Sequence, residues 1–446
     1  MSGDPSVAAG TRSIERSREL QERANRVVPG GSQTGSKSPT QFVHGVSPTH
    51  LERGKGCRVW DVDGNEYIDH TMSLGPVTLG HDYPEVTRAV ERQLADGTMF
   101  TLEHPLHVEV AELFTEVVPC AEMVQFAKNG NDVTTLAAKL ARAHTGRNVV
   151  ATFGYHGWPD VWMSSHSNLD RGIPDAVGEY TERFEYNDIA SLERIFDAHP
   201  GDVAAVVMVA AHLEAPRDDF LERVRELCDE HDTILVYDEV LTGFRFSLGG
   251  AQEYFGVIPD LACFAKGMAN GYPVAALAGR EDVMRTLGDD DFMFSTTYAG
   301  EALSLAAAKA AITVQRSEPV HEHLWKQGET IRAEIGEITE SLGLDSRVSV
   351  PGFAPHSSIA FTDENGDPDT MGKSLFMQEC HERGVLFAGS HLPCYSHTDE
   401  DIEETLSVYE AALTTLADGI DAGDVASRLD GSPVGATLRQ RTGEED

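Results

Sequence analysis

Short runs of apolar residues recur through the middle of the chain, and longer stretches with apolar residues at helical spacing separate them. The runs expected as strands are residues 123–127, 149–153, 203–209, 234–238, 261–265 and 274–278. Between them, residues 133–144 and 218–231 place apolar residues three and four apart, which predicts amphipathic helices. Alternating strands and helices form parallel sheets. The pattern therefore predicts an α/β fold with a mostly parallel central sheet and helices on both faces.

The two ends of the chain follow other patterns. Residues 57–69 alternate apolar and polar positions around an Asp-Gly-Asn turn, which predicts a β-hairpin. Beyond residue 319 a helix, two strand-like runs at 357–361 and 385–388 and a helix at 399–416 predict a smaller α+β C-terminal domain. The predicted organisation is an N-terminal arm with a small sheet (1–75), a large α/β domain (76–318), the C-terminal domain (319–418) and a frayed polar tail (419–446).

Acidic residues dominate the composition. The 446 residues include 73 Asp and Glu against 35 Lys and Arg, of which only 8 are Lys, so the formal net charge is −38. Phosphate neutralisation needs a basic face, so this balance argues against a nucleic-acid partner. It indicates a salt-adapted, halophilic protein, because salt at 1 M screens self-repulsion beyond about 3 Å. An ordinary acidic enzyme is the alternative.

The remaining composition places the protein in the cytoplasm. The first residues are polar, and the longest apolar run is much shorter than a membrane span, so no membrane partner is expected. The six cysteines lie far apart and predict reduced, buried thiols. His104 and His107 are separated by Pro105, which breaks the helix that would align them, so we expect no metal site.

Two polar residues directly follow apolar strands, where an open α/β sheet binds its ligands. Asp238 ends the run Ile-Leu-Val-Tyr, and a desolvated acid there needs a cationic or N–H partner such as a protonated pyridine nitrogen. Lys266 follows the run at 261–265, and a desolvated lysine can attack a carbonyl as a neutral amine. The alternatives are a turn-capping acid and a surface lysine. We read Glu239 as structural, because neighbouring strand residues point to opposite faces.

Two further features lie at strand ends. Gly130 and Asn131 open a helix whose free N–H groups favour an anion such as phosphate, although ordinary capping explains them equally well. Tyr155 follows the strand at 149–153 and offers a flat face for stacking, with rim packing as the alternative. An acid for a ring nitrogen, a lysine for an aldehyde and a helix start for a phosphate together predict pyridoxal 5'-phosphate as the cofactor.

The chain resembles the class III (ω-type) aminotransferases, in the branch that includes glutamate-1-semialdehyde aminomutase. The resemblance rests on the motifs RGKG at 53–56, WDVDGNEYID at 60–69, DEVLTGFR at 238–245, and KG with NGYP at 266–273. It implies a fold-type I enzyme that depends on pyridoxal phosphate. A small-molecule amine donor and a carbonyl acceptor would be its substrates.

The resemblance also implies residue roles. Lys266 would be the Schiff-base lysine and proton shuttle, and Asp238 would pair with the pyridine nitrogen. Tyr155 and Val240 would flank the ring, and Gly130 and Asn131 would bind the phosphate through backbone N–H groups. Thr297 would reach the phosphate of a neighbouring subunit, which implies a homodimer with shared active sites.

Three departures from the family pattern affect the function. Asn131 stands where the family usually has a hydroxyl residue, and Val209-Ala210 replaces a Glu-Pro pair. The aminomutase has a longer gating loop than residues 158–174 and an arginine in the N-terminal arm. Lys37 is a candidate replacement for that cation, with a flexible loop as the alternative.

These departures favour an aminotransferase, of a kind found beside amino-sugar or polysaccharide pathways, over the intramolecular aminomutase. A catalytically silent relative that binds the cofactor is the third hypothesis. We expect the substrate walls to come from the N-terminal arm, residues 73–75 and the loop at 390–398. The sequence does not identify the substrate.

Overall fold

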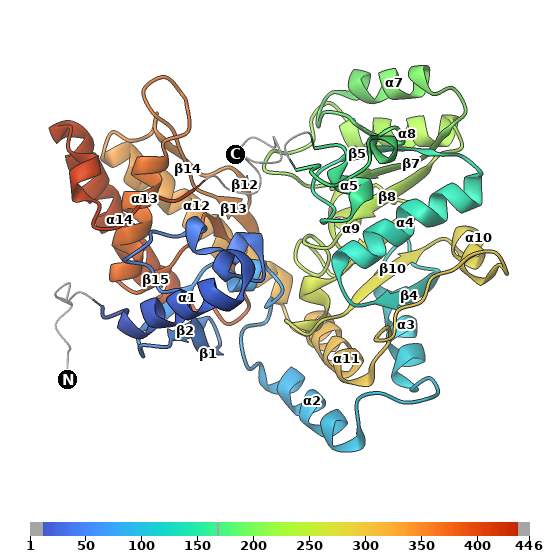
Figure 1. Cartoon of the computed structure of the whole chain (residues 1–446), viewed down its shortest axis with the longest axis horizontal. Helices are drawn as coiled ribbons and strands as arrows, with labels where there is room; N and C mark the ends of the chain where they lie inside the picture. Colours follow the sequence, from blue (N-terminus) through green and yellow to red (C-terminus); the bar gives the residue numbers. More distant parts are fainter. Residues whose placement is uncertain (1–11, 167–168, 436–446) are drawn as a thin grey trace.

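The computed structural model describes residues 12–166 and 169–435, which form two parts lying side by side (Figure 1). The middle of the chain builds one part around a seven-stranded sheet, and the first and last segments together build the other. Three predictions extend beyond the described residues, because the arm includes 1–11, the loop after Tyr155 includes 167–168 and the tail includes 436–446.

The large sheet has the order β4-β10-β9-β8-β7-β5-β6, and β10 is antiparallel to both of its neighbours while every other pair is parallel. Its strands are β4 (Met123–Ala127), β5 (Val149–Phe153), β6 (Thr181–Arg183), β7 (Val203–Met208), β8 (Ile234–Asp238), β9 (Leu261–Phe264) and β10 (Ala275–Gly279). The central strands are apolar along their whole length because helices cover both faces. The predicted α/β fold with a mostly parallel sheet is confirmed.

Helices cover both faces of the sheet, because alternate apolar residues of its strands point to opposite faces. Val207 and Val236 pack toward α4, whereas Val206 and Leu235 pack toward α7 and α8 on the opposite face. The helices of this part are α2 (Pro84–Asp96), α3 (Leu106–Val117), α4 (Gly130–Thr145), α5 (Asp160–Met163), α6 (Asp175–Gly178), α7 (Ile189–Ala198), α8 (Phe220–Glu230), α9 (Ala251–Phe255), α10 (Glu281–Met284) and α11 (Ala302–Ser317). Four neighbouring parallel strands, β5, β7, β8 and β9, therefore end at the same edge of the sheet.

The second part combines both ends of the chain. Its helices are α1 (Glu15–Val27), α12 (Val320–Ser341), α13 (Thr370–Glu382) and α14 (Asp399–Ala422). Its strands are β1 (Leu51–Lys55), β2 (Arg58–Asp61), β3 (Glu66–Asp69), β11 (Val348–Ser349), β12 (Gly352–Phe353), β13 (His356–Ser358), β14 (Ala360–Phe361), β15 (Val385–Leu386) and β16 (Ser390–His391). Short 3-10 helices are η1 (Pro29–Gly31), η2 (Gly35–Lys37), η3 (Pro39–Gln41), η4 (Met72–Leu74), η5 (Lys266–Ala269), η6 (Arg285–Gly288) and η7 (Val425–Arg428).

The predicted hairpin at 57–69 is the β2–β3 pair, but the structure differs from two other expectations. The strand expected at 385–388 is β15, which pairs in parallel with β3 and so completes the N-terminal sheet. The run at 357–361 forms two short strands that belong to different sheets, β13 and β14. Both differences concern which strand pairs with which, and the apolar pattern of a strand does not specify its pairing partner.

The last helix is longer than the predicted range of 399–416. Helix α14 continues through Gly419 to Ala422 and ends at Gly423, which has a left-handed φ of 66°. Gly419 lies inside the helix, and η7 packs closely on it, because a Cβ there would lie 3.2 Å from Val425 Cγ2.

All six cysteines are unpaired and buried. Within residues 12–166 and 169–435, no helix is long and apolar enough to cross a membrane.

Candidate active site

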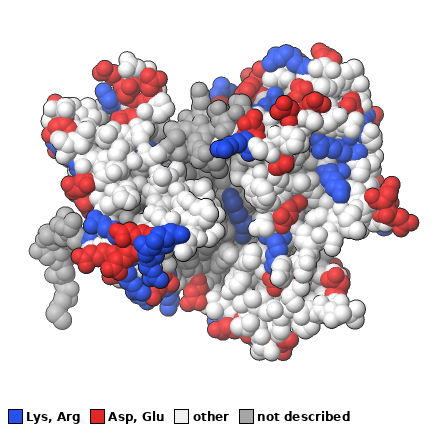
Figure 2. Space-filling view, in the orientation of Figure 1, with Lys and Arg blue, Asp and Glu red and all other residues white. Residues whose placement is uncertain are grey.

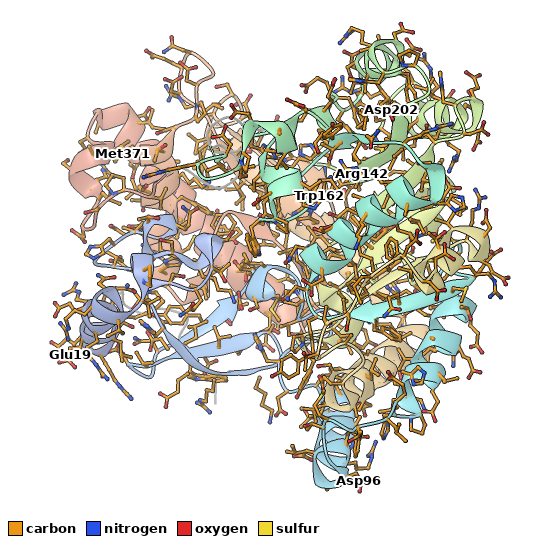
Figure 3. The ribbon with its side chains drawn as sticks, turned by 45° about the vertical axis from the view of Figure 1, so that its right-hand side comes forward. Glu19, Asp96, Arg142, Trp162, Asp202 and Met371 are labelled. Atoms are coloured by element: carbon orange, nitrogen blue, oxygen red, sulfur yellow. The ribbon has the colours of Figure 1, made fainter. Side chains whose placement is uncertain are left out.

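Asp238, the last residue of β8, is buried and held by two hydrogen bonds. Its Oδ2 lies 2.7 Å from His156 Nδ1, and its Oδ1 accepts a hydrogen bond from the Val240 N–H at 3.0 Å. A buried carboxylate requires such partners. His156 is itself buried and packs edge to face against Trp162 of α5, which Figure 3 labels. The sequence does not reveal the Asp238–His156 pair, and its one signal is a histidine beside Tyr155 at a nearby strand end.

Lys266 lies one strand away from Asp238. Asp238 pairs with Cys263 in the β8–β9 register, and Lys266 begins the turn that follows β9. Its backbone has a left-handed φ of 39°, which a non-glycine residue rarely adopts and which marks functional sites. Asn270 fixes this turn by accepting the Leu79 N–H at 2.9 Å and donating to the Gly80 carbonyl at 2.9 Å.

The start of α4 lies against the turn that follows β8. A Cβ on Gly130 would come within 2.9 Å of both Cγ atoms of Val240, so only glycine permits this approach. A Cβ on Gly157 would lie 2.4 Å from Asn131 Cβ, which brings the loop after β5 to the same place. The N–H groups of Gly130 and Asn131 have no preceding helical turn to accept from them, so they can bind an anion.

The residues after β5 and β7 complete this edge of the sheet. Tyr155 is 41% exposed and precedes the buried His156. Val209 faces Gly154, where a Cβ would lie 3.1 Å from Val209 Cγ2 and 3.6 Å from His156 Cε1. The position where the resembled family has a carboxylate therefore carries a methyl surface.

A turn from the N-terminal segment closes over the ends of β8 and β9. We call Met72–Gly75 the substrate-side turn. A Cβ on Gly75 would lie 2.7 Å from Leu241 Cδ1, and a Cβ on Gly267 would lie 2.8 Å from Thr78 Oγ1. Lys37 Nζ donates to Ser73 Oγ at 3.3 Å, so the N-terminal arm reaches this turn. A carboxylate-binding role for Lys37 stays a prediction.

Thr297 lines a hollow that none of the other six predicted residues lines. This hollow measures about 270 Å³, and residues 98–104, 125, 294–296 and 299–302 also line it. Apolar side chains are exposed beside it, including Phe100, Leu102 and Tyr298. Within one chain, the structure therefore brings Gly130, Asn131 and Val240 together beside Asp238, with Tyr155 and Lys266 at the adjacent strand ends.

Glu239 points to the other side of the sheet from Asp238. It accepts hydrogen bonds from the N–H groups of Ala251 at 2.9 Å and Gln252 at 2.8 Å, and it also contacts the Thr242 hydroxyl. Burial raises the pKa of its carboxyl above the ordinary value. These contacts tie the start of α9 to β8, in agreement with a structural role.

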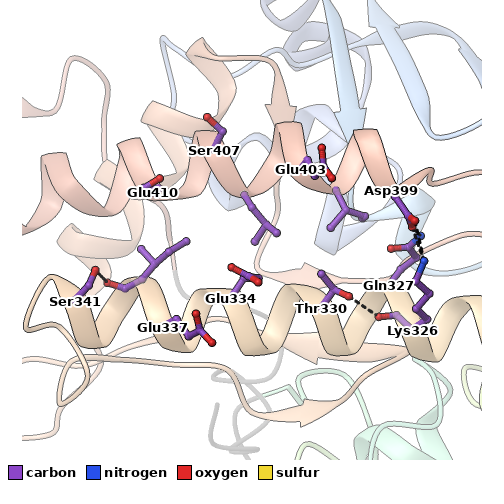
Figure 4. A pocket seen from close by; sticks show the side chains of 13 residues that line it. Lys326, Gln327, Thr330, Glu334, Glu337, Ser341, Asp399, Glu403, Ser407 and Glu410 are labelled. Carbon is purple, nitrogen blue, oxygen red and sulfur yellow. Dashed lines mark hydrogen bonds and ion pairs between the residues drawn. The ribbon is translucent and has the colours of Figure 1, made fainter. Parts of the chain in front are cut away.

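Another hollow lies between α12 and α14 and measures about 750 Å³ (Figure 4). Carboxylates line its sides, with Ile402 and Leu406 between them, and the carboxylates are those of Glu334, Glu337, Asp399, Glu403 and Glu410. No predicted site residue lines it. In the described part of the chain, no three His, Cys, Asp or Glu side chains are arranged to hold a metal ion.

Comparison with known proteins gives a consistent result. The family model described as aminotransferase class-III matches residues 42–413. A 3-aminobutyryl-CoA aminotransferase of Cloacimonas acidaminovorans is 35% identical, over 90% of this chain and 98% of that protein. A glutamate-1-semialdehyde 2,1-aminomutase of Halorubrum lacusprofundi is 34% identical, over 90% and 99%.

Solved structures agree in fold. The FumI protein of Sphingopyxis sp. MTA144, in its PLP internal aldimine form, has a TM-score of 0.85 and 31% identity, covering 93% of this chain and 98% of its own. An omega-transaminase from Sphaerobacter thermophilus has a TM-score of 0.81 and 27% identity, covering 90% and 98%.

Proposed function

Because the chain belongs to the class III aminotransferases, which use pyridoxal 5'-phosphate, we propose that it transfers an amino group from an amine or amino acid donor to a carbonyl acceptor at the edge of the sheet formed by β5, β7, β8 and β9. The observation that carries the proposal is the buried Asp238, held by His156 and followed one strand later by the strained Lys266 turn. A buried acid beside a lysine suits a cationic ring and an aldehyde.

The residues present fit this cofactor. Gly130 leaves room beside Val240, and the N–H groups of Gly130 and Asn131 form an anion site at the start of α4. Asp238 would hold the ring nitrogen, and Tyr155 and Val240 would flank the ring. When bound, the cofactor would withdraw electrons from the donor and so weaken the C–H bond that loses its proton.

The protein's own groups then do the following work. The Lys266 amine would hold the cofactor through its aldehyde, and as a free amine it would take up and return the proton of the donor. The Asp238 carboxylate would stabilise a proton on the ring nitrogen, and His156 orients that carboxylate. The substrate-side turn and the loop at 390–398 exclude water and orient the donor.

Replacing Lys266 tests this role. We expect Lys266→Ala to abolish turnover and to lose the visible absorption of covalently attached cofactor, because Lys266 is the amine proposed to attach it. Lys309→Ala is the matched control, since Lys309 pairs with Glu109 on the surface. Spectra and initial rates with a panel of amines measure the effect. Turnover that persists in Lys266→Ala would contradict the proposal.

Intramolecular amino transfer, as in the glutamate-1-semialdehyde aminomutase relatives, is the second candidate because they align over 90% of the chain. Product formation from one amino aldehyde with no added donor would decide for it. If no amine converts the bound cofactor to its amine form, the catalytically silent hypothesis is correct. An amino-sugar substrate stays a prediction.

We also infer a homodimer with shared active sites. The exposed apolar residues around Thr297 support it, as does the hollow that Thr297 lines without the other six predicted residues. Thr297 of each subunit would complete the phosphate site of the other. Sedimentation at high salt measures the oligomeric state. A monomer that keeps its cofactor and full activity under the same conditions would contradict this inference.

A further inference from the structure

Arg245 is a fully buried cation that binds only uncharged oxygens. Its Nη1 donates to the carbonyls of Pro355 at 3.1 Å and Pro393 at 3.0 Å. Its Nη2 donates to the Gly75 carbonyl at 3.0 Å and to Thr78 Oγ1 at 3.4 Å. Burial lowers the pKa of the guanidinium to about 10, so it stays charged at pH 7. Burying a charge without an ionic partner costs free energy, which indicates that the geometry fixed by Arg245 is needed.

The oxygens that Arg245 binds belong to three separate segments. Gly75 ends the substrate-side turn, Pro393 lies in the loop at 390–398, and Pro355 lies in the β12–β13 turn. Two of these segments are expected walls of the substrate site. Arg245 itself lies seven residues beyond Asp238, on the turn that leaves β8. One side chain therefore connects the cofactor strand to two substrate walls.

The substrate-side turn needs such support because its backbone is strained. Met72, Ser73, Leu74 and Gly75 all have positive φ, at 43°, 59°, 73° and 94°. For the non-glycine residues this conformation is strained and persists only where the surroundings enforce it. Asp69 Oδ1 holds one end by accepting the N–H groups of Thr71 at 2.9 Å and Met72 at 3.0 Å. Arg245 holds the other end.

We propose that Arg245 is a positioning residue for substrate binding, which fixes the substrate-side turn to the loop at 390–398. A planar guanidinium with five donors can bind several carbonyls at once, whereas a lysine ammonium cannot match that arrangement. The inference rests on the proposed transamination, because the substrate walls are assigned through it. It concerns the order of the turn and the affinity for the donor, and Arg245 does not act on the reacting atoms.

Hydrogen exchange of the holoprotein tests the structural half without any substrate. We expect Arg245→Lys to speed exchange in peptides covering residues 72–79 by at least about tenfold. Exchange in β7 and β8 should not change, whereas a general loss of stability would raise it there too. Arg225→Lys is the control, because Arg225 pairs with Asp260 before β9, at the opposite edge of the sheet. Unchanged exchange at 72–79 would overturn the proposal.

Steady-state kinetics tests the functional half. With L-alanine or 3-aminobutyrate as donor, whichever the wild type deaminates, we expect Arg245→Lys to raise KM about tenfold. Its kcat per bound cofactor should stay within about twofold of wild type. A fall in kcat with unchanged KM would overturn the proposal. If the wild type deaminates no donor, the proposed function fails and the exchange result still reports on the turn.

A second variant covers the case in which Arg245→Lys does not fold. Gly75→Ala disturbs the same carbonyl from the other side, because its Cβ would lie 2.7 Å from Leu241 Cδ1 at a φ of 94°. We expect the same combination of faster exchange at 72–79 and raised KM. An unchanged KM in Gly75→Ala would contradict a role for the turn in donor binding.

Discussion

Asp238 illustrates how a buried charge is kept in place. One carboxylate oxygen binds His156 and the other binds the Val240 N–H, so both oxygens are oriented by groups at the same sheet edge. The Thr134 hydroxyl in turn donates to the His156 carbonyl at 2.7 Å, which links this pair to α4. A shift of the histidine would therefore move the acid relative to the ring nitrogen that we propose it holds.

His156 should consequently matter for rate. A hydrogen bond to a charged group is worth about 1.5–3 kcal/mol, so we expect His156→Phe to lower kcat by about 10–100-fold. His156→Asn, which keeps a donor near the Nδ1 position, should recover part of the loss. His144→Asn on exposed α4 surface is the control. Equal rates for the Phe and Asn variants would show that the bond to Asp238 is not the cause.

Single residues differ in how far the sequence predicts them. Asp238 and Lys266 stand out because an apolar strand ends directly before each. The His156 contact joins residues 82 positions apart, and only the order β8-β7-β5 in the sheet brings them together. The contacts of Arg245 join residues more than 100 positions apart in the sequence, so no local pattern predicts them.

At the scale of elements, the position of the start of α4 depends on Gly130, which has no side chain. Gly130 lets the helix approach Val240, and this approach places the free N–H groups beside the proposed ring site. Asp132 caps the same turn by accepting the Asn129 N–H at 2.8 Å.

We expect Gly130→Ala to weaken binding of pyridoxal phosphate by about tenfold or more, because its Cβ would force α4 away from Val240 by overpacking of about 1–3 kcal/mol. Gly336→Ala in α12 is a matched control, since nothing lies within 4 Å of its Cβ position. That control should stabilise the protein by about 0.5–1 kcal/mol and leave cofactor binding unchanged. Cofactor titration by absorbance and thermal melts measure both effects. Equal cofactor affinity in the two variants would contradict the packing argument.

Elements of the large sheet are predictable because they are apolar throughout. The bounds of β4, β5 and β8 match the predicted runs. Helices α1 and α2 are absent from the sequence-based prediction, because their patterns are mainly polar and most helical stability comes from tertiary packing. Helix α7 is also absent from that prediction, although its ten residues are amphipathic. The pairing of β15 with β3 depends on contacts between distant segments, which a local pattern does not contain.

At the scale of the whole molecule, buried histidines make stability depend on pH. His70, His391 and His397 lie together, with ring centroids of His70 at 5.7 Å from His391 and 4.8 Å from His397. Burial lowers the pKa of His391 to about 3 and of His397 to about 4, and it also lowers that of His70. Asp69 and Asp401 face His397 and only partly offset this effect.

Stability should be greatest above pH 6.5 and should fall as the pH drops toward 4. The unfolded histidines bind protons below about pH 6.5 while the folded ones stay neutral, so each shifts the unfolding equilibrium by about tenfold per pH unit in that window. Urea unfolding at pH 7, 6 and 5 measures the slope. His391→Asn should reduce the slope by one proton. An unchanged slope in that variant would show that His391 does not titrate on unfolding.

Net charge acts on the same scale. Acidic side chains are spread over both parts of the face shown in Figure 2, with basic ones between them. At −38 per chain, two subunits repel each other unless salt screens the charge. We expect dilution from about 1 M into about 0.01 M salt to dissociate the dimer and release cofactor, as followed by light scattering and absorbance. A dimer that keeps its cofactor in low salt would refute salt adaptation and leave the aminotransferase assignment intact.

The pairing of β15 with β3 has a consequence for synthesis of the protein. Strands β1 to β3 are complete by Asp69, but the strand that closes their sheet begins at Val385. At about 5–20 residues per second, a ribosome makes that strand roughly 15–60 s after β3. During this interval the edge of β3 lacks its native partner. The nascent chain must therefore keep an unfinished N-terminal sheet from pairing elsewhere until almost all of the protein has been translated.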